Sequence, residues 1–237
     1  MALDLARVQA ICFDVDGTLS DTDDQWLAMF ERRLALLRGL FPDGNMRQFA
    51  RWVIMAAETP GNLVYGILDR VNLDDEVGRL YSYLSQRSVG RHPREFWLVE
   101  GISEMLETLH KRFPLSIVSA RDDKSTLAFL EQYGLARYFS SIATAWTCRY
   151  TKPFPDPVLW AAEQMGVAPE NCLMVGDTTV DIRAGKLAGA QTVGVLCGFG
   201  QENELRRAGA DLILPHTAAL AAVLLSPDIR TSQPDGA

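Results

Sequence analysis

The sequence predicts an α/β fold with two parts: a doubly wound parallel sheet and a second, smaller domain of α-helices. From Gly101 onward, apolar segments typical of buried strands alternate with helical patterns, as in the βαβ units of a parallel sheet. Residues 20–95 carry only helical patterns, with short breaks at Pro and Gly. They separate the first predicted strand from the alternating segment, so we expect a small helical bundle inserted into the sheet domain.

Each element follows from a local pattern. The first strand is predicted over 8–13, an apolar run interrupted only by Gln9. Helices in the insert are predicted from apolar residues at helical spacing, beginning with Trp26, Phe30, Leu34 and Leu37. After the insert, the predicted helices are 103–112, 125–133, 157–165, 179–187 and 218–225, and the predicted strands are 115–118, 142–145, 172–175, 192–196 and 211–214.

These elements predict the domain boundaries. The sheet domain takes residues 1–19 and 96–225, and the helical domain takes residues 20–95. Residues 226–237 contain Pro, Ser, Gln and Gly with almost no apolar residues, and we expect this tail to be disordered.

Composition and charge disfavour several classes of protein. The chain has 237 residues, of which 48% are hydrophobic and 22% charged, as in an ordinary globular protein. Its net charge of -7 disfavours a general affinity for nucleic acid.

No apolar run reaches the roughly 18 residues of a membrane span, and the N-terminus lacks the pattern of a signal peptide. The cysteines are scattered without Cys-x-x-Cys, which favours reduced thiols in a cytoplasmic protein. We expect a monomer or homodimer.

Two carboxylates end the first predicted strand. Asp14 and Asp16 are two residues apart, so both side chains can face one site, and Gly17 allows a tight turn and a close approach of a ligand. Such a stretch is often only a turn closed by Asx hydrogen bonds. A calcium loop is the other alternative, but Cys12 would hold its first ligand position and a strand, not a helix, precedes it. The context therefore disfavours calcium.

Further polar residues follow other predicted strands. Ser119 follows the strand 115–118, and Lys152 lies in the loop after the strand 142–145. Asp177 follows the strand 172–175, and Asp181 lies in the first turn of the next helix. Taken singly, these residues have ordinary explanations as a cap, a solvated lysine and acids at a helix start. Because ligands bind outside the carboxyl ends of parallel strands, their joint placement predicts one active site.

Four motifs occur in order around the helical insert: Asp14-Val-Asp-Gly-Thr18, Val118-Ser119, Lys152-Pro153 and Gly176-Asp-Thr-Thr-Val-Asp181. In this order they resemble the haloacid dehalogenase superfamily, on the branch with a helical cap after the first motif. The resemblance covers the chain to about residue 225 and is closest to phosphoglycolate phosphatase-like hydrolases. It implies a Rossmann-like catalytic core, a cap domain, and Mg²⁺-dependent hydrolysis of a small phosphorylated metabolite through an aspartyl-phosphate.

The resemblance also implies a role for each motif residue. Asp14 would be the nucleophile, Asp16 the general acid and base, and Lys152 the charge that offsets the acids and the transferring phosphoryl group. The implied metal ligands are Asp14, the backbone carbonyl of Asp16, and Asp177, with Asp181 supporting the metal shell from outside. The implied phosphate-binding residues are Thr18, Ser119, Ala120 and Lys152.

Two departures and two alternatives remain open. Ser119 is followed by Ala120-Arg121, whereas many relatives have Asn after the Ser or Thr, and Arg121 would either touch phosphate or be solvated. Thr178 replaces a commoner Ser. A β-phosphoglucomutase-like mutase is the second reading, although such mutases usually carry a cap lysine and none lies between Ser20 and Glu100. A non-catalytic binding protein on the same fold is the third. Arginines of the insert could bind a substrate carboxylate, and the candidates are Arg32, Arg33, Arg47 and Arg51.

Overall fold

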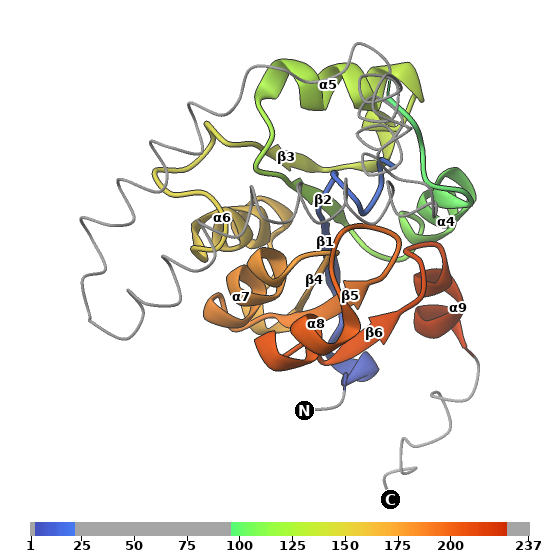
Figure 1. Ribbon diagram of the computed structural model, residues 1–237. Helices are drawn as coiled ribbons and strands as arrows, with labels where there is room; N and C mark the ends of the chain where they lie inside the picture. Colours follow the sequence, from blue (N-terminus) through green and yellow to red (C-terminus); the bar gives the residue numbers. More distant parts are fainter. Residues whose placement is uncertain (1–2, 22–95, 227–237) are drawn as a thin grey trace, which may run out of the picture.

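The computed structural model describes residues 3–21 and 96–226, and in them the chain forms one parallel sheet flanked by helices (Figure 1). The six strands follow the order β3-β2-β1-β4-β5-β6, and each pairs with its neighbours in parallel. The strand order reverses between β1 and β4, which is the place where ligands bind in doubly wound sheets. The strands are β1 (Ala10–Phe13), β2 (Leu115–Val118), β3 (Ser141–Ala143), β4 (Cys172–Gly176), β5 (Gln191–Val195) and β6 (Leu212–Leu214).

Helices alternate with these strands, as predicted. Each predicted helix after the insert has an observed counterpart, with ends shifted by up to three residues. The structure adds one helix that the pattern did not predict, α8, because its seven residues bury only Leu205 and so give no apolar period. The helices are α4 (Ile102–Leu109), α5 (Asp123–Gln132), α6 (Asp156–Met165), α7 (Thr179–Leu187), α8 (Glu202–Ala208) and α9 (Ala219–Leu225).

Helices cover both faces of the sheet: the four inner strands are fully buried, and the edge strands β3 and β6 are partly buried. In β1, Ile11 and Phe13 face a core cluster that includes residues of α4, α5 and α9. Ala10 and Cys12 face the opposite way, into a second cluster formed with α6 and α7. Because successive strand residues point to opposite faces, this division confirms the doubly wound α/β fold predicted from the sequence.

The two chain segments that flank the insert are paired with each other. Ser20 and Leu98 form an isolated antiparallel bridge. The amide of Asp21 donates to the carbonyl of Trp97 over 2.8 Å, and the amide of Val99 donates to the carbonyl of Leu19 over 3.0 Å. The chain therefore leaves and re-enters the sheet domain at one place. Residues 22–95 of the predicted helical domain lie outside the described residues. Residues 227–237 of the predicted tail also lie outside them.

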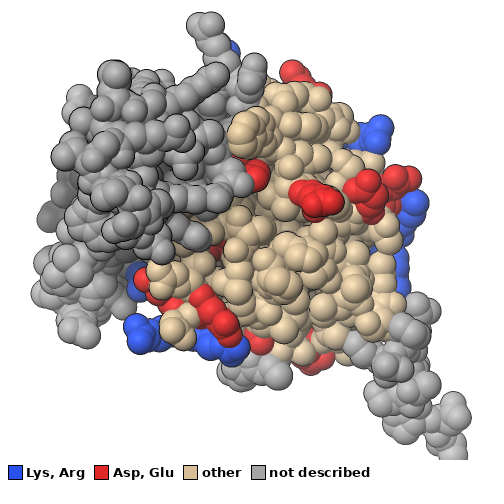
Figure 2. Space-filling model, turned by 45° about the vertical axis from the view of Figure 1, so that its right-hand side comes forward, with Lys and Arg blue, Asp and Glu red and all other residues tan. Residues whose placement is uncertain are grey.

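The described surface carries mixed charge. On the face drawn in Figure 2, the described lysines and arginines stand apart or beside acidic side chains. No helix among the described residues is long and apolar enough to cross a membrane. The four cysteines are free thiols, as expected from their spacing.

Candidate active site

The site begins where β1 ends. Asp14 continues the pairing of β1 with β4, since its amide donates to the carbonyl of Val175 over 2.9 Å, and its side chain is buried. Gly17 then turns the chain with a φ of 68°. A Cβ on Gly17 would lie 2.4 Å from Oδ2 of Asp177, so a side chain there would displace that carboxylate. Glycine thus brings the ends of β1 and β4 together.

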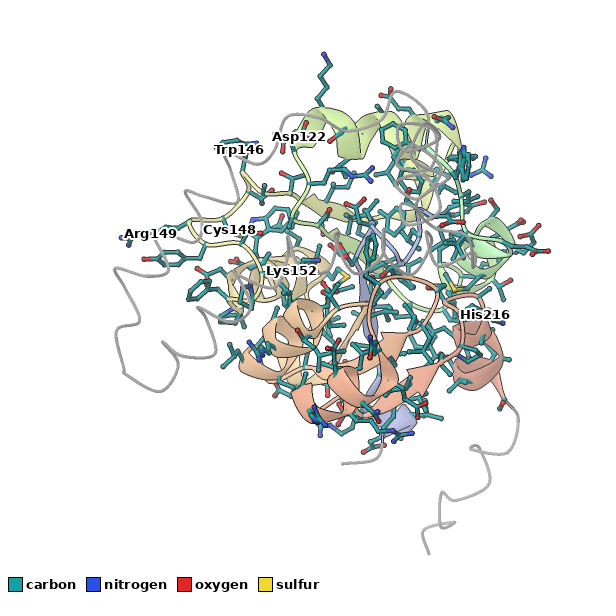
Figure 3. The ribbon with its side chains drawn as sticks, viewed as in Figure 1. Asp122, Trp146, Cys148, Arg149, Lys152 and His216 are labelled. Atoms are coloured by element: carbon teal, nitrogen blue, oxygen red, sulfur yellow. The ribbon has the colours of Figure 1, made fainter. Side chains whose placement is uncertain are left out.

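Lys152 joins two of the acids. Its Nζ lies 2.7 Å from Oδ1 of Asp14 and 2.6 Å from Oδ1 of Asp181, and all three side chains are buried. The lysine comes from the loop between β3 and α6. Figure 3 shows it at the inner end of that loop, while Trp146 and Arg149 lie toward its outer edge. A lysine that is 3% exposed is held as a charge partner for these acids, and the solvated alternative is wrong.

This burial changes the protonation of the pair. Burial raises the pKa of Asp14, Lys152 lowers it, and the nearby Asp181 and Asp16 raise it, so that together these effects bring it to about 7. Burial alone would lower the pKa of Lys152, but the charges of Asp14 and Asp181 outweigh it and hold the pKa above its usual value. Lys152 is therefore a fixed positive charge at neutral pH, and Asp14 needs a further cation to be fully ionised there.

Asp177 follows β4 and is fixed on two sides. The hydroxyl of Thr18 donates to its Oδ1 over 3.4 Å, and the amide of Phe199 donates to its Oδ2 over 2.9 Å. Gly198 closes around the same carboxylate, since a Cβ there would lie 2.1 Å from its Oδ2. The segment 198–200, which the sequence did not single out, thus orients an acid of the site.

Asp181 has a different environment from the other acids. It lies in the first turn of α7 and forms a capping box with Thr178, whose amide and hydroxyl both donate to Oδ2 of Asp181. Its Oδ1 is held by Lys152. Because both carboxylate oxygens already have partners, Asp181 orients the lysine.

The acids can hold a divalent cation. One ligand atom from each of Asp14, Asp177 and Asp181 lies within 4.8 Å of the others, in a buried cluster. With Asp181 engaged by Lys152 and Thr178, the donors best placed for a cation are the oxygens of Asp14 and Asp177. Hard oxygen donors of this kind fit Mg²⁺, and a buried group of acids is stabilised by a cation.

The end of β2 contributes polar groups to the same edge of the sheet. Ser119 is buried, and its amide donates to the carbonyl of Ala143 over 2.9 Å. Its Oγ accepts a hydrogen bond from the amide of Arg121, which leaves the hydroxyl proton to donate elsewhere. Ala120 between them is exposed. The polar residues that follow β1, β2 and β4 thus lie at the same edge of the sheet, because these strands are parallel neighbours.

Arg121 is buried, so of the two environments considered from the sequence the solvated one is wrong. It is 2% exposed, which rules out a solvated side chain, and its guanidinium grips the carboxylate of Asp16. Asp16 itself is half-buried, with 35% of its side chain exposed. Sequence reasoning missed this pair because its partners are 105 residues apart in the chain.

Comparisons with known proteins show the family to which the chain belongs. A model of the haloacid dehalogenase-like hydrolases matches residues 11–195. The chain is 30% identical to the pyrophosphatase PpaX of Oceanobacillus iheyensis over 210 residues, covering 87% of this chain and 92% of that protein. It is 28% identical to the phosphoglycolate phosphatase of Escherichia coli O157:H7 over 224 residues, covering 87% and 88%.

A solved structure agrees with the fold. The structure of a hydrolase of the same family from Deinococcus radiodurans R1, with bound phosphate and sodium, covers 92% of this chain and 96% of that one, with a TM-score of 0.65 and 24% identity. This likeness supports the fold, and the family is shown by the family model over residues 11–195 and by the relative at 30% identity. The chain belongs to the haloacid dehalogenase-like hydrolase family.

Proposed function

We propose that the protein is a Mg²⁺-dependent phosphatase that hydrolyses a small phosphorylated metabolite through an aspartyl-phosphate on Asp14. One observation carries this proposal: Asp14 is buried at the carboxyl end of β1, with Lys152 on one side and Asp177 close enough to share a cation. A carboxylate in this position can attack phosphorus, because positive charge on both sides offsets the charge of the incoming phosphate.

In the first step, an oxygen of Asp14 forms a bond to phosphorus, and the bond from phosphorus to the leaving oxygen breaks. Asp16, on the same side of the chain two residues later, donates a proton to that oxygen. In the second step a water molecule attacks the aspartyl-phosphate, Asp16 takes its proton, and the carboxylate of Asp14 is released with inorganic phosphate. The half-exposed side chain of Asp16 suits this role, since it must reach both a leaving group and water.

Other residues bind the phosphoryl oxygens. Lys152 supplies a fixed charge, and Ser119 supplies a hydroxyl proton, with the amide of Ala120 as a further donor. The amide of Thr18 and those of its two neighbours already donate to backbone carbonyls, and the hydroxyl of Thr18 donates to Asp177. When bound between Asp14, the carbonyl of Asp16 and Asp177, Mg²⁺ would neutralise charge on the phosphoryl group. Asp181 keeps Lys152 in place and is not itself a ligand in this proposal.

The proposed substrate is a small phosphorylated compound. The curated relatives act on pyrophosphate and on phosphoglycolate by their names, so a small phosphorylated compound is the shared feature. We assign the choice of substrate to the helical insert, because every motif residue lies in the sheet domain.

A screen of phosphorylated metabolites tests this function. Purified protein is incubated with each compound and Mg²⁺, and phosphate release is measured alongside isomerisation of sugar phosphates. Phosphate release that stops in excess chelator and returns with Mg²⁺ supports the proposal. Isomerisation without phosphate release would favour a mutase, and unchanged turnover in chelator would contradict the metal site.

A further inference from the structure

We propose that Thr217 and Cys197 are positioning residues that hold the turn Gly17-Thr18 against Asp177 and so keep the Mg²⁺ site formed before the metal binds. This inference rests on the metal site of the proposed function, and it adds two residues outside the four motifs. Both residues act through the turn, and neither is assigned a contact with metal or substrate.

The first observation is that side chains from two distant segments hold consecutive carbonyls of the turn. The hydroxyl of Thr217 donates to the carbonyl of Thr18 over 2.7 Å, and Sγ of Cys197 donates to the carbonyl of Gly17 over 3.3 Å. The two side chains also contact each other, with Sγ of Cys197 lying 3.4 Å from Oγ1 of Thr217. The segments that follow β5 and β6 thus hold the turn that follows β1.

The second observation is that Thr217 lies on a fixed part of the chain. It is in the turn between β6 and α9, where Figure 3 labels His216, and its carbonyl accepts from the amide of Leu220 over 3.0 Å. The next residue, Ala218, packs against the start of α4, since a Cβ on Gly101 would lie 2.9 Å from its Cβ. A hydroxyl at the start of a packed helix holds a loop in one place.

The third observation is that the held turn contacts Asp177 at both carboxylate oxygens. A Cβ on Gly17 would lie 2.4 Å from Oδ2 of Asp177, and the hydroxyl of Thr18 donates to Oδ1 over 3.4 Å. The segment that contains Cys197 also holds this acid, since the amide of Phe199 donates to its Oδ2 over 2.9 Å. The turn and the acid therefore share one support.

The fourth observation is the residue type at position 217. Thr217 is 0% exposed and directly precedes the start of α9, an apolar helix. Valine has almost the same shape and would fill this buried position without a hydroxyl that must find a partner. The hydroxyl is consequently better explained by its hold on the turn than by packing.

The turn lies between two proposed ligands of Mg²⁺. The carbonyl of Asp16 precedes it, and the carboxylate of Asp177 lies against it. If the turn is loosened, metal binding must also order these ligands, and the cost of ordering appears as weaker binding. Replacing groups that orient metal ligands typically weakens metal binding about 10- to 100-fold, and one step farther out we expect about 5- to 20-fold.

The experiment measures the Kd for Mg²⁺ by calorimetry, with the full-length protein and magnesium chloride alone, at a temperature where every variant is folded. For Thr217→Val, which removes only the hydroxyl donor, we expect the Kd to rise about 5- to 20-fold. Thr217→Ser keeps the donor, so its Kd should change less than about twofold.

Thr192→Val is the matched control. Thr192 is also 0% exposed, and its hydroxyl donates to Asp211 over 3.2 Å, at the start of β5 and away from the turn. The same substitution there removes a buried hydroxyl hydrogen bond and lowers stability, but the Kd for Mg²⁺ should change less than about twofold. A rise in Kd for Thr192→Val equal to that for Thr217→Val would overturn the inference.

Hydrogen exchange without Mg²⁺ separates positioning from a general loss of stability. Four consecutive amides, those of residues 17–20, donate hydrogen bonds within the turn. In Thr217→Val these amides should exchange about tenfold faster or more, while amides of β4 and β5 should change less than about threefold. Equal acceleration throughout the sheet domain, or an unchanged Kd for Mg²⁺, would overturn the inference.

A second variant covers the case in which Thr217→Val does not fold, as judged by circular dichroism. Cys197→Ala removes the donor to the carbonyl of Gly17, and the same two measurements are made on it. We expect its Kd for Mg²⁺ to rise about threefold, with faster exchange confined to residues 17–20. A wild-type Kd and wild-type exchange in this variant would refute the inference.

Failure of this inference is distinguishable from failure of the proposed function. If the wild type binds no Mg²⁺, the metal dependence in the proposed function fails and this inference fails with it. If the wild type binds Mg²⁺ and Asp177→Asn abolishes that binding while Thr217→Val binds as the wild type does, the proposed function stands. Only the roles of Thr217 and Cys197 are then refuted.

Discussion

Replacement of Lys152 by methionine should destabilise the protein strongly, and by an amount that depends on pH. The lysine is 3% exposed and lies within 2.7 Å of two buried carboxylates, those of Asp14 and Asp181. Removing one partner of a buried ion pair costs about 3–5 kcal/mol, because the remaining charge stays uncompensated. For a chain of this size, that loss corresponds to a fall in Tm of about 6–20 °C.

The pH dependence follows from Asp14. Its pKa is raised to about 7 in the presence of the lysine, and loss of a nearby positive charge raises it further. An acid with a raised pKa in the folded state is protonated there at a pH where the unfolded chain has released the proton, so stability falls as the pH rises. In the wild type the decrease in stability with rising pH ends near pH 7, whereas in Lys152→Met the decrease continues above that pH. The gap between the two proteins should therefore widen from about pH 6 to about pH 8.5.

Urea unfolding followed by circular dichroism measures this gap at each pH, with and without Mg²⁺. A cation beside Asp14 should narrow it, because the cation replaces the missing positive charge. Lys111→Met, which removes an exposed lysine paired with Glu107, is the control and should change stability by less than about 1 kcal/mol at every pH. A loss in Lys152→Met below about 1 kcal/mol, or one that is the same at all pH values, would refute the reasoning.

Three further predictions concern the same site. Because the pKa of Asp14 is raised to about 7, Mg²⁺ binding near pH 6 should release close to one proton, and the affinity for Mg²⁺ should weaken as the pH falls. Calorimetry in two buffers of different ionisation enthalpy measures the number of protons released. Binding without proton release would contradict the prediction. Gly17→Ala should weaken Mg²⁺ binding by tenfold or more, because the added Cβ would displace the carboxylate of Asp177. Gly166 has a similar φ but open space around it, so Gly166→Ala should leave Mg²⁺ binding unchanged and cost only about 1 kcal/mol of stability. With an aryl phosphate, rapid quench should show a phenol burst followed by slow turnover for Asp16→Asn and no burst for Asp14→Asn; equal progress curves would argue against separate roles.

The alternation of elements could be predicted because the four inner strands are fully buried, the edge strands β3 and β6 are still largely apolar, and each longer helix has an apolar side. The carboxyl ends of parallel strands meet at one edge of a sheet, so the convergence of Asp14, Ser119, Lys152 and Asp177 also followed from local patterns. Helix α8 escaped this reasoning because it buries only Leu205. Its absence from the prediction reflects the weak signal of a short surface helix.

Contacts between distant side chains were beyond a pattern argument. The position of Arg121 between Phe96 and Asp16 depends on three segments that only the folded sheet brings together. The same holds for the division of labour among the acids. The sequence places Asp181 beside Asp177, but only the contacts with Lys152 and Thr178 show that both of its oxygens are engaged.

The antiparallel bridge between Ser20 and Leu98 has a consequence for evolution and engineering. Since the segments flanking the insert are hydrogen-bonded to each other, the ends of whatever lies between them are already close, and the entropy of closing that loop depends only weakly on its length. Lineages could lengthen, shorten or exchange the intervening segment without altering the register of β1 against β2 and β4. A short turn joining Asp21 to Phe96 would leave every described strand pairing in place, which makes this bridge a natural junction for grafting foreign domains.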